Sequence, residues 1–226
     1  TMRNGTLGNG NNGQWGWGYF ANNYFDPRQI TVENQALGGM STRTFYTDLW
    51  PAVREALQPG DWVIVSIGHN DGGPIDEGRA RSVLSGTGQD SVVVTIKETG
   101  VKETVYTYGG YMRRYISDIR ARGGHPVLMS LTPRNAYDKE WPRHVTRVNQ
   151  TFGLWAQQVA EEMDCPFVDL NELSARKYEQ MSEWKFNYHF YLDHIHTSTF
   201  GARLNAESAA EGLLIGDHRE LKPLQR

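Results

Sequence analysis

The sequence has little cysteine, no long apolar run and no excess of basic charge. Its single cysteine, Cys165, rules out an internal disulfide framework. No window approaches the roughly 18 to 20 consecutive apolar residues that a bilayer span requires, so we expect no membrane partner. Lys and Arg total 23 against 26 Asp and Glu, a formal net charge of −3. This balance argues against a general nucleic-acid binder, which needs a basic face to neutralise phosphates.

The remaining composition is that of one globular domain. The chain has 226 residues, of which 38% are hydrophobic, and this length is enough to bury a sizeable core. No repeat, low-complexity tract or linker divides it, so we predict a single domain over residues 1–226. Aromatic residues make up 12% of the chain, a share that suits both packed cores and sugar-binding clefts.

Short apolar runs alternate with amphipathic stretches along the chain. The runs are rich in β-branched residues, as is typical of strands buried on both faces. The stretches carry apolar residues at three- and four-residue spacing, the pattern of a helix with one buried side. This alternation predicts a parallel sheet covered on both faces by helices. The expected strands are 30–33, 62–67, 126–131 and 166–170, and the expected helices are about 44–57, 109–122, 143–163 and 199–215.

One segment departs from the alternation. Residues 91–96 and 101–108 are two β-prone runs, joined by the turn-like sequence KETG at 97–100. They predict a β-hairpin inserted ahead of a helix. The pattern is compatible with a lid over a site and with a surface decoration.

The strongest local signal is Gly68-His69-Asn70-Asp71, which directly follows the run WVIVSI. Ligands bind at the carboxyl ends of strands in open α/β sheets, so this polar cluster lies where a site is expected. The Asn70 amide is able to donate to a developing oxyanion, and Gly68 permits a sharp turn. The competing interpretation is an Asx-type turn that merely ends the strand.

A second signal is the run from Leu192 to Ser198, just ahead of the last expected helix. Asp193 and His196 are three residues apart and suit a general base whose imidazole is held by a carboxylate. Asp193, His194 and His196 are also plausible metal ligands, with Asp71 and His69 as further candidates. Ordinary loop histidines are the third interpretation.

A third signal is the loop NQALGGMSTR at 34–43. Gly38 and Gly39, followed by Ser41, make a loop whose backbone N–H groups are able to point at an anion, helped by the helix N-terminus behind them. A simple glycine-rich turn with a Ser or Thr N-cap explains the pattern equally well.

Aromatic rings and one histidine are candidates for substrate contact. Trp15, Trp17 and Tyr19 are interleaved with glycine and asparagine and could line a sugar cleft or pack in a core. Of this group we select Trp17, together with His69 beside Asn70, as the residues expected to contact substrate.

The combination of motifs is more specific than its parts. In this order along nearly the whole chain, they resemble the SGNH (GDSL-like) hydrolases, and most closely their rhamnogalacturonan acetylesterase branch. The resemblance implies a flavodoxin-like, three-layer α/β/α fold with a parallel sheet. It is carried by GWG at 16–18, NQALGG at 34–39, STRTF at 41–45, LQPGDWVIVSIGHNDGG at 57–73, YTYGGYMRRYI at 106–116, LTPRN at 131–135 and LDHIHTS at 192–198.

The resemblance also implies roles for individual residues. His196 would be the general base and acid, Asp193 would orient its imidazole, and Gly39 N–H and the Asn70 amide would form the oxyanion hole. The family usually has Arg where this chain has Met40, so a substrate contact made by that Arg is in doubt. The family's nucleophilic Ser, with its strand, would lie immediately before Thr1.

We therefore expect a serine esterase that needs no metal or cofactor and removes O-acetyl groups from a plant cell-wall polysaccharide, with pectic rhamnogalacturonan as the first candidate. An acetylated polysaccharide is the expected partner, and the substrate class implies a secreted or periplasmic enzyme. Two alternatives remain open. One is a metal-dependent, phosphoesterase-like hydrolase that uses Asp193, His194 and His196, and the other is a non-catalytic carbohydrate-binding module.

Overall fold

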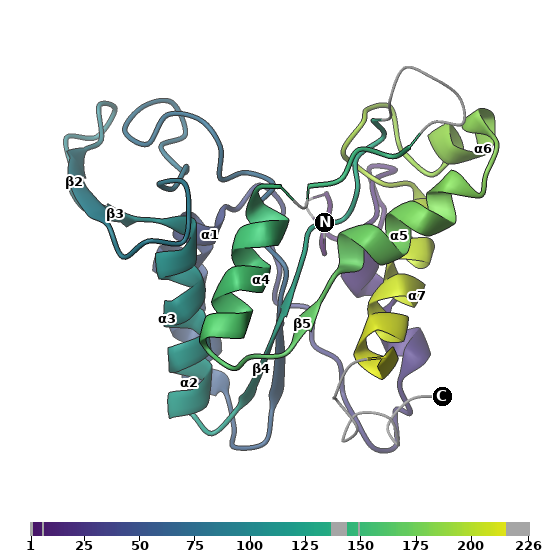
Figure 1. Cartoon of the computed structure of the whole chain (residues 1–226), viewed down its shortest axis with the longest axis horizontal. Helices are drawn as coiled ribbons and strands as arrows, with labels where there is room; N and C mark the ends of the chain where they lie inside the picture. The colour runs from purple at the N-terminus through teal and green to yellow at the C-terminus, as the bar shows by residue number, and fades with distance from the viewer. Residues whose placement is uncertain (1, 6, 137–143, 149, 216–226) are drawn as a thin grey trace. The chain divides into compact units, whose positions relative to one another are not determined.

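A computed structural model describes residues 2–5, 7–136, 144–148 and 150–215 (Figure 1). The chain divides into two compact units, which we call the first and second unit. The first unit comprises Thr1–Gly38, Ser130–Gln150 and Val168–Arg226, and the second comprises Gly39–Met129 and Thr151–Phe167. Each is described by itself.

The main sheet is parallel and has the strand order β1-β4-β5. Strand β1 is Trp62–Val65, β4 is His125–Met129 and β5 is Phe167–Val168. Strands β1 and β4 pair from Trp62↔His125 to Val65↔Leu128. All three strands lie within or beside the runs predicted at 62–67, 126–131 and 166–170, so the α/β class with a parallel sheet is confirmed.

The helices of the second unit follow the predicted stretches closely. Predicted helix 44–57 is a continuous helical stretch made of α1 (Thr42–Thr44), the π-helical turn η3 (Phe45–Leu49) and α2 (Trp50–Ala56). Helix α3 is Tyr108–Ala121, and α4 is Phe152–Glu162. Helices α3 and α4 pack against each other and against β4.

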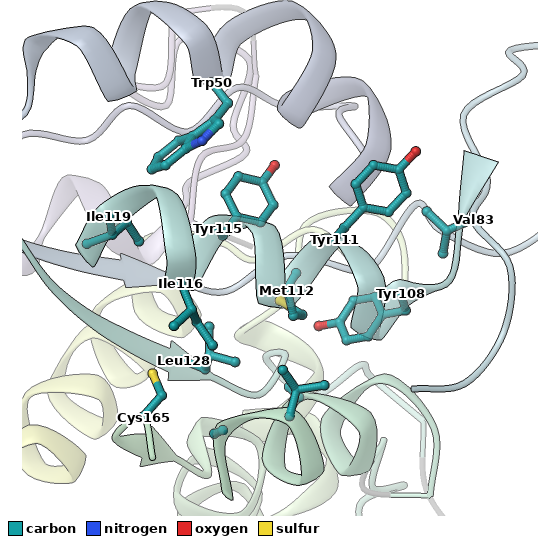
Figure 2. Packing of buried hydrophobic residues seen from close by; sticks show 13 residues of the cluster. Trp50, Val83, Tyr108, Tyr111, Met112, Tyr115, Ile116, Ile119, Leu128 and Cys165 are labelled. Atoms are coloured by element: carbon teal, nitrogen blue, oxygen red, sulfur yellow. The ribbon is translucent and has the colours of Figure 1, made fainter. Parts of the chain in front are cut away.

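Aromatic side chains of α3 form the centre of the second unit's core. Figure 2 shows the ring of Tyr115 beside Trp50 of α2, and the centroids of these two rings lie 4.9 Å apart, edge to face. Their polar ends find partners at the edge of the core: Tyr115 Oη donates to Thr42 O at 3.0 Å, and Trp50 Nε1 donates to Asp118 Oδ2 at 2.8 Å. Buried aromatic rings with satisfied polar atoms add apolar area without an unpaired donor.

The inserted hairpin is confirmed. Strands β2 (Ser91–Thr95) and β3 (Lys102–Tyr106) pair antiparallel, from Ser91↔Tyr106 to Thr95↔Lys102. Most of β2 is exposed, whereas β3 leads directly into α3. Thr107 begins that helix as its N-cap, with its hydroxyl accepting from Gly110 N at 2.9 Å.

The first unit consists of helices around a second, smaller core. The 3-10 helices η1 (Trp17–Tyr19) and η2 (Ala21–Tyr24) contact α7 (Thr199–Ile215), which also packs against α5 (Leu170–Glu179). Helix α6 is Glu183–Tyr188. The buried core residues are Val145, Ala175, Tyr178, Phe186, Phe190 and Leu204. The last predicted helix, 199–215, matches α7 at both ends.

The strand expected at 30–33 is wrong. Its side chains alternate between half-buried and exposed, as the sequence pattern suggests. A strand also needs backbone pairing with a neighbour, and in the part of the chain that the structure describes no strand pairs with this segment. Its backbone is bound in other ways: Ile30 N donates to Asp26 O at 3.0 Å, and Val32 O accepts from Asn22 Nδ2 at 3.5 Å.

The helix expected at 143–163 begins only at Phe152, because its first part is bound in another way. Val145 N donates to Glu179 Oε1 at 2.8 Å and Val148 N donates to Asn171 Oδ1 at 3.2 Å. These side chains of α5 bind backbone N–H groups that a helix would pair internally. The apolar spacing of the sequence runs through this part as well, so it does not mark where the helix begins. Residues 143 and 149 of this expected helix lie outside the described residues. Helices α5 and α6 were not predicted from the sequence.

Among the described residues, no helix is both long enough and apolar enough to cross a bilayer.

Candidate active site

The first unit holds Asp193 and His196 in direct contact. His196 Nδ1 lies 2.6 Å from Asp193 Oδ2, and His196 N and Ile195 N donate to Asp193 Oδ1 at 2.7 and 2.8 Å. Both side chains expose 37% of their surface, so solvent and a substrate are able to reach the imidazole. The i,i+3 spacing predicted from the sequence therefore does bring the two side chains together.

Hydrogen bonding keeps the Asp193 carboxylate ionised. Partial burial by itself would raise its pKa, but the hydrogen bonds from His196 and Ile195 outweigh burial and lower the pKa below its ordinary value. An ionised carboxylate only accepts, so His196 Nδ1 carries the proton in this contact. The other ring nitrogen, Nε2, is then a proton acceptor in the neutral imidazole, which is what a general base requires.

The loop around the pair is closed by backbone hydrogen bonds. Tyr191 N donates to His196 O at 2.8 Å, and Asn135 N donates to His194 O at 2.8 Å. Leu192 has φ +60°, a conformation that a leucine rarely adopts, and exposes 90% of its surface. Strain of this kind persists only where the surrounding structure fixes it.

A chain of hydrogen bonds ties this loop to the beginning of the sequence. Trp15 N donates to Thr197 O at 2.9 Å, and Thr197 Oγ1 donates back to Trp15 O at 2.6 Å. The buried Asn4 also donates to Trp15 O, at 2.9 Å. The residues next to His196 and the residues next to Thr1 are therefore fixed to the same segment.

The segment from Met2 to Gly5 runs close to two glycine motifs of the first unit. A Cβ on Gly16 would lie 2.2 Å from Met2 O, so only glycine allows this approach. On the other side, a Cβ on Gly38 would lie 3.6 Å from Arg3 O. The start of the chain thus lies beside Gly38, the residue that precedes Gly39 in the sequence.

The second unit contains the Gly39 loop and the GHND turn, and it clamps them together. Asn70 Nδ2 donates to Met40 O at 2.9 Å. Asp71 accepts from Thr42 N at 3.2 and 3.0 Å with its two oxygens. Two adjacent residues of the turn therefore fix the loop and the first residue of α1. The Asn70 amide group has two N–H donors, and the contact with Met40 O uses one of them.

The Gly39 loop leads into a capped helix. Ser41 is the N-cap of α1 and forms a capping box with Thr44, in which each side chain accepts from the other residue's backbone N–H. Gly39 has φ +86°, and a Cβ there would meet nothing within 4 Å. Glycine is needed for its backbone conformation rather than for space. The Ser N-cap expected for a glycine-rich turn is present.

Asp71 is the buried carboxyl group of this unit. It is 1% exposed, and burial raises its pKa to about 6, although the hydrogen bonds from Thr42 and the charge of Arg81 act in the opposite direction. The turn is closed by a backbone hydrogen bond, from Asp71 N to Gly68 O at 3.2 Å, and the Asp71 carboxylate binds Thr42 N rather than its own turn as an Asx-type turn would.

The two residues predicted to contact substrate lie in different environments. Trp17 exposes 3% of its surface and packs in the first unit, which disfavours direct contact with a ligand. The neighbouring Tyr19 exposes 49%. His69 is half-buried in the turn beside Asn70, and its role stays a prediction.

The described residues contain no group of three or more His, Cys, Asp or Glu side chains placed to hold a metal ion. The metal alternative required Asp193, His194 and His196 as ligands, but both Asp193 oxygens accept hydrogen bonds from the loop itself. Among the described residues, the metal alternative therefore has no set of ligands.

Several contributors to the site were not predicted from the sequence. Asn4, Trp15 and Thr197 fix the loop of the Asp193–His196 pair, and Arg81 donates to Gly39 O at 2.7 Å. The Thr197–Trp15 contact joins residues 182 positions apart, and no local spacing marks such a pair.

Comparison with known proteins places these motifs in a family. Residues 4–204 match the model of the GDSL-like Lipase/Acylhydrolase family. A rhamnogalacturonan acetylesterase of Emericella nidulans is 28% identical over 195 residues, which are 85% of this chain and 76% of that protein. A probable rhamnogalacturonan acetylesterase of Bacillus subtilis is 27% identical over 219 residues, 92% of this chain and 87% of that protein.

Solved structures confirm the fold. A Bacillus subtilis protein of known crystal structure superposes with a TM-score of 0.71 at 22% identity, over 90% of this chain and 51% of that one, so this chain spans about half of its length. A catalytic mutant of an acetylxylan esterase from Geobacillus stearothermophilus superposes with a TM-score of 0.53 at 19% identity, over 88% of this chain and 80% of that one. With the Asp193–His196 pair and the Asn70–Met40 contact in place, the family match over residues 4–204 shows that the chain belongs to the GDSL-like Lipase/Acylhydrolase family.

Proposed function

We propose that this chain is a serine esterase that removes O-acetyl groups from a plant cell-wall polysaccharide, and that this polysaccharide is pectic rhamnogalacturonan. The relatives named as rhamnogalacturonan acetylesterases support the substrate. The observation that carries the proposal is the Asp193–His196 contact, since an imidazole held through Nδ1 by an ionised carboxylate presents Nε2 as a base.

In the proposed reaction, the nucleophile is a serine, which we infer from the family resemblance to lie directly before Thr1. Its Oγ attacks the acetyl carbonyl carbon while His196 Nε2 accepts the hydroxyl proton. The Asp193 carboxylate stabilises the imidazolium that forms. The hydrogen bonds from Asn4 and Thr197 to Trp15 O support a nucleophile at this place. They hold Asn4, near the start of the chain, and Thr197, next to His196, on the same residue.

The oxyanion of the tetrahedral intermediate is assigned to Gly39 N–H, the Asn70 amide and the nucleophile's own N–H. Donors that are fixed before the reaction stabilise the developing charge without reorganisation. Asn70 is fixed by its bond to Met40 O, and Asp71 accepts from Thr42 N, so the loop is clamped at Met40 and at Thr42.

The intermediate then collapses, and the sugar hydroxyl leaves with the proton from His196. Water then attacks the acetyl-serine while His196 Nε2 accepts its proton; the bond between Oγ and the acetyl carbon breaks, Oγ takes the proton from His196, and acetate is released. Residues of the protein supply every proton transfer in this scheme, and no cofactor takes part. Because the substrate is an extracellular polymer, we also propose that the protein is secreted or periplasmic and serves pectin degradation.

A fluorophosphonate probe applied to the full-length protein tests the mechanism, with peptide mass spectrometry locating the adduct. We expect the adduct on the serine that precedes Thr1, release of acetate from acetylated rhamnogalacturonan, and loss of both in a His196→Ala variant. An unlabelled but folded protein that carries this serine would contradict the mechanism.

A further inference from the structure

Arg81 supplies a guanidinium group to the loop of the proposed oxyanion hole. Its Nη1 donates to Gly39 O at 2.7 Å, although the two residues are 42 positions apart. The next residue of that loop is Met40, which carries no charge. A positive group is therefore present at this loop, but it comes from residues 75–82, which we call the arginine loop.

The acidic groups around the arginine loop are already engaged. Glu77 pairs with Lys97 at 2.6 Å, Asp76 lies 3.5 Å from the same ammonium group, and Glu98 accepts from Gly78 N at 2.6 Å. Among the described residues, neither Arg79 nor Arg81 forms an ion pair, and the only hydrogen bond from the two guanidinium groups is the one to Gly39 O.

The position of the arginine loop is fixed from the same helix that begins at the Gly39 loop. Arg43 of α1 is 1% exposed and donates to Ile75 O at 2.8 Å and to Ser82 O at 3.1 Å, near the two ends of the arginine loop. Between them, Ala80 has φ +43°, a conformation that only a fixed turn maintains. The backbone of the arginine loop is thus fixed at both ends, and the Arg81 guanidinium is held by Gly39 O.

Electrostatics within the second unit agrees with this picture. Partial burial lowers the pKa of Arg81, the positive charge of Arg79 lowers it further, and only the buried Asp71 acts in the opposite direction. Two like charges that act on each other in this way attract an anion from solution.

We propose that Arg79 and Arg81 form a carboxylate subsite beside the Gly39 loop, which selects acetyl esters on chains that contain uronic acid. The inference rests on the proposed function and deepens it. A rhamnogalacturonan backbone carries galacturonate carboxylates, and a planar guanidinium group binds a carboxylate through two parallel hydrogen bonds. Arg81 Nη1 is held by Gly39 O, which leaves its Nε and Nη2 edge for such a contact.

The test compares three acetylated substrates of the full-length protein: a rhamnogalacturonan oligosaccharide, the same oligosaccharide with its carboxyl groups reduced to alcohols, and 4-nitrophenyl acetate. In the wild type we expect KM for the acidic oligosaccharide to be about tenfold lower than for its reduced form, as one charge-assisted contact would give. The Arg79→Gln variant should lose about this factor on the acidic substrate and keep kcat/KM on the other two.

Two further variants separate charge recognition from support of the loop. Arg81→Lys keeps the charge and a donor but not the planar fork, so KM for the acidic substrate should rise several-fold, roughly as one hydrogen bond is lost. Arg122→Gln removes the same charge at the C-terminal end of α3 and should leave all three substrates unchanged. Thermal unfolding monitored by circular dichroism confirms that each variant folds.

The outcomes distinguish this inference from the proposed function. Equal KM values for the acidic and reduced oligosaccharides in the wild type, or an equal loss on all substrates in Arg79→Gln, would overturn the subsite while leaving the esterase intact. If no ester is hydrolysed, the proposed function fails, and calorimetric titration with the deacetylated acidic oligosaccharide and its reduced form decides the subsite. Tighter binding of the acidic form that Arg79→Gln abolishes supports it, and equal binding rejects it.

Discussion

Asp193 accepts three hydrogen bonds from its own loop, and one of them comes from the ring of His196. The depressed pKa of this carboxyl group means that the native state holds it ionised at neutral pH. Its contribution to stability is therefore present above the ordinary pKa of an aspartate and is lost only as the pH falls through the lowered native value.

Replacing Asp193 tests this arrangement at the residue scale. In Asp193→Asn the amide is able to donate to Nδ1, which moves the imidazole proton to Nε2 and removes the base. We expect kcat on 4-nitrophenyl acetate to fall roughly 10³- to 10⁴-fold with little change in KM. His194→Asn is the matched control and should stay near wild type. A large loss in His194→Asn instead would favour the metal alternative.

Asp71 gives a prediction for stability against pH. Its native pKa of about 6 lies above the roughly 3.9 of an unfolded aspartate, so the native state binds this proton more tightly. The free energy of unfolding should therefore decrease as the pH rises from about 4 to about 6, by on the order of 3 kcal/mol at most, and then level off. Asp71→Asn does not titrate and should lack this decrease.

Urea unfolding of both proteins between pH 4 and pH 7.5 measures the effect as the difference between the two curves. Other groups titrate equally in both proteins and cancel in this difference. Parallel curves would show that burial does not raise the Asp71 pKa.

At the scale of elements, the hairpin is joined to α1 by one buried ion pair. Arg43 Nε and Nη2 contact the two oxygens of Glu103 in β3 at 2.7 and 2.6 Å. The guanidinium group is 1% exposed and the carboxylate is 29% exposed. The hairpin, predicted either as a lid or as a decoration, thus has a supporting contact to the helix that follows the Gly39 loop.

Removing the carboxylate should leave the guanidinium buried without its charge partner. For Glu103→Ala we expect a loss of roughly 3 kcal/mol in the free energy of unfolding, as for other broken buried pairs. Glu98→Ala removes an exposed carboxylate from the same hairpin and should cost less than about 1 kcal/mol. Chemical denaturation measures both, and similar values for the two variants would show that the Arg43–Glu103 pair does not anchor the hairpin.

At the scale of the whole molecule, the question is whether a metal ion takes part. The described residues hold no ligand cluster, and the family match is to lipases and acylhydrolases. We expect EDTA to leave acetate release from acetylated rhamnogalacturonan unchanged, and added Zn²⁺ or Mn²⁺ not to raise it. Loss of activity with EDTA that either metal restores would promote the metal-dependent alternative.

Much of the architecture follows from local patterns. The hairpin at 91–108, helix 199–215 and the cap at Ser41 depend on spacing and turn residues within a few positions, and local geometry fixes all three. The strand expected at 30–33 failed because pairing depends on a partner elsewhere. The helix expected from 143 failed in its first part because α5 side chains bind the backbone there. The prediction of one domain over residues 1–226 stays a prediction.

The sequence by itself determined the α/β class, the family and the Asp193–His196 contact. The contact is local, because Asp193 and His196 lie three residues apart in one loop whose own backbone binds the carboxylate. Only the tertiary structure decided that Trp17 is buried, that Thr197 and Asn4 share Trp15 O, and that Arg81 reaches Gly39 O. The physical reason is the sequence separation of the residues in contact. These contacts form only when the folded backbone brings distant segments together, so local residue propensities do not predict them.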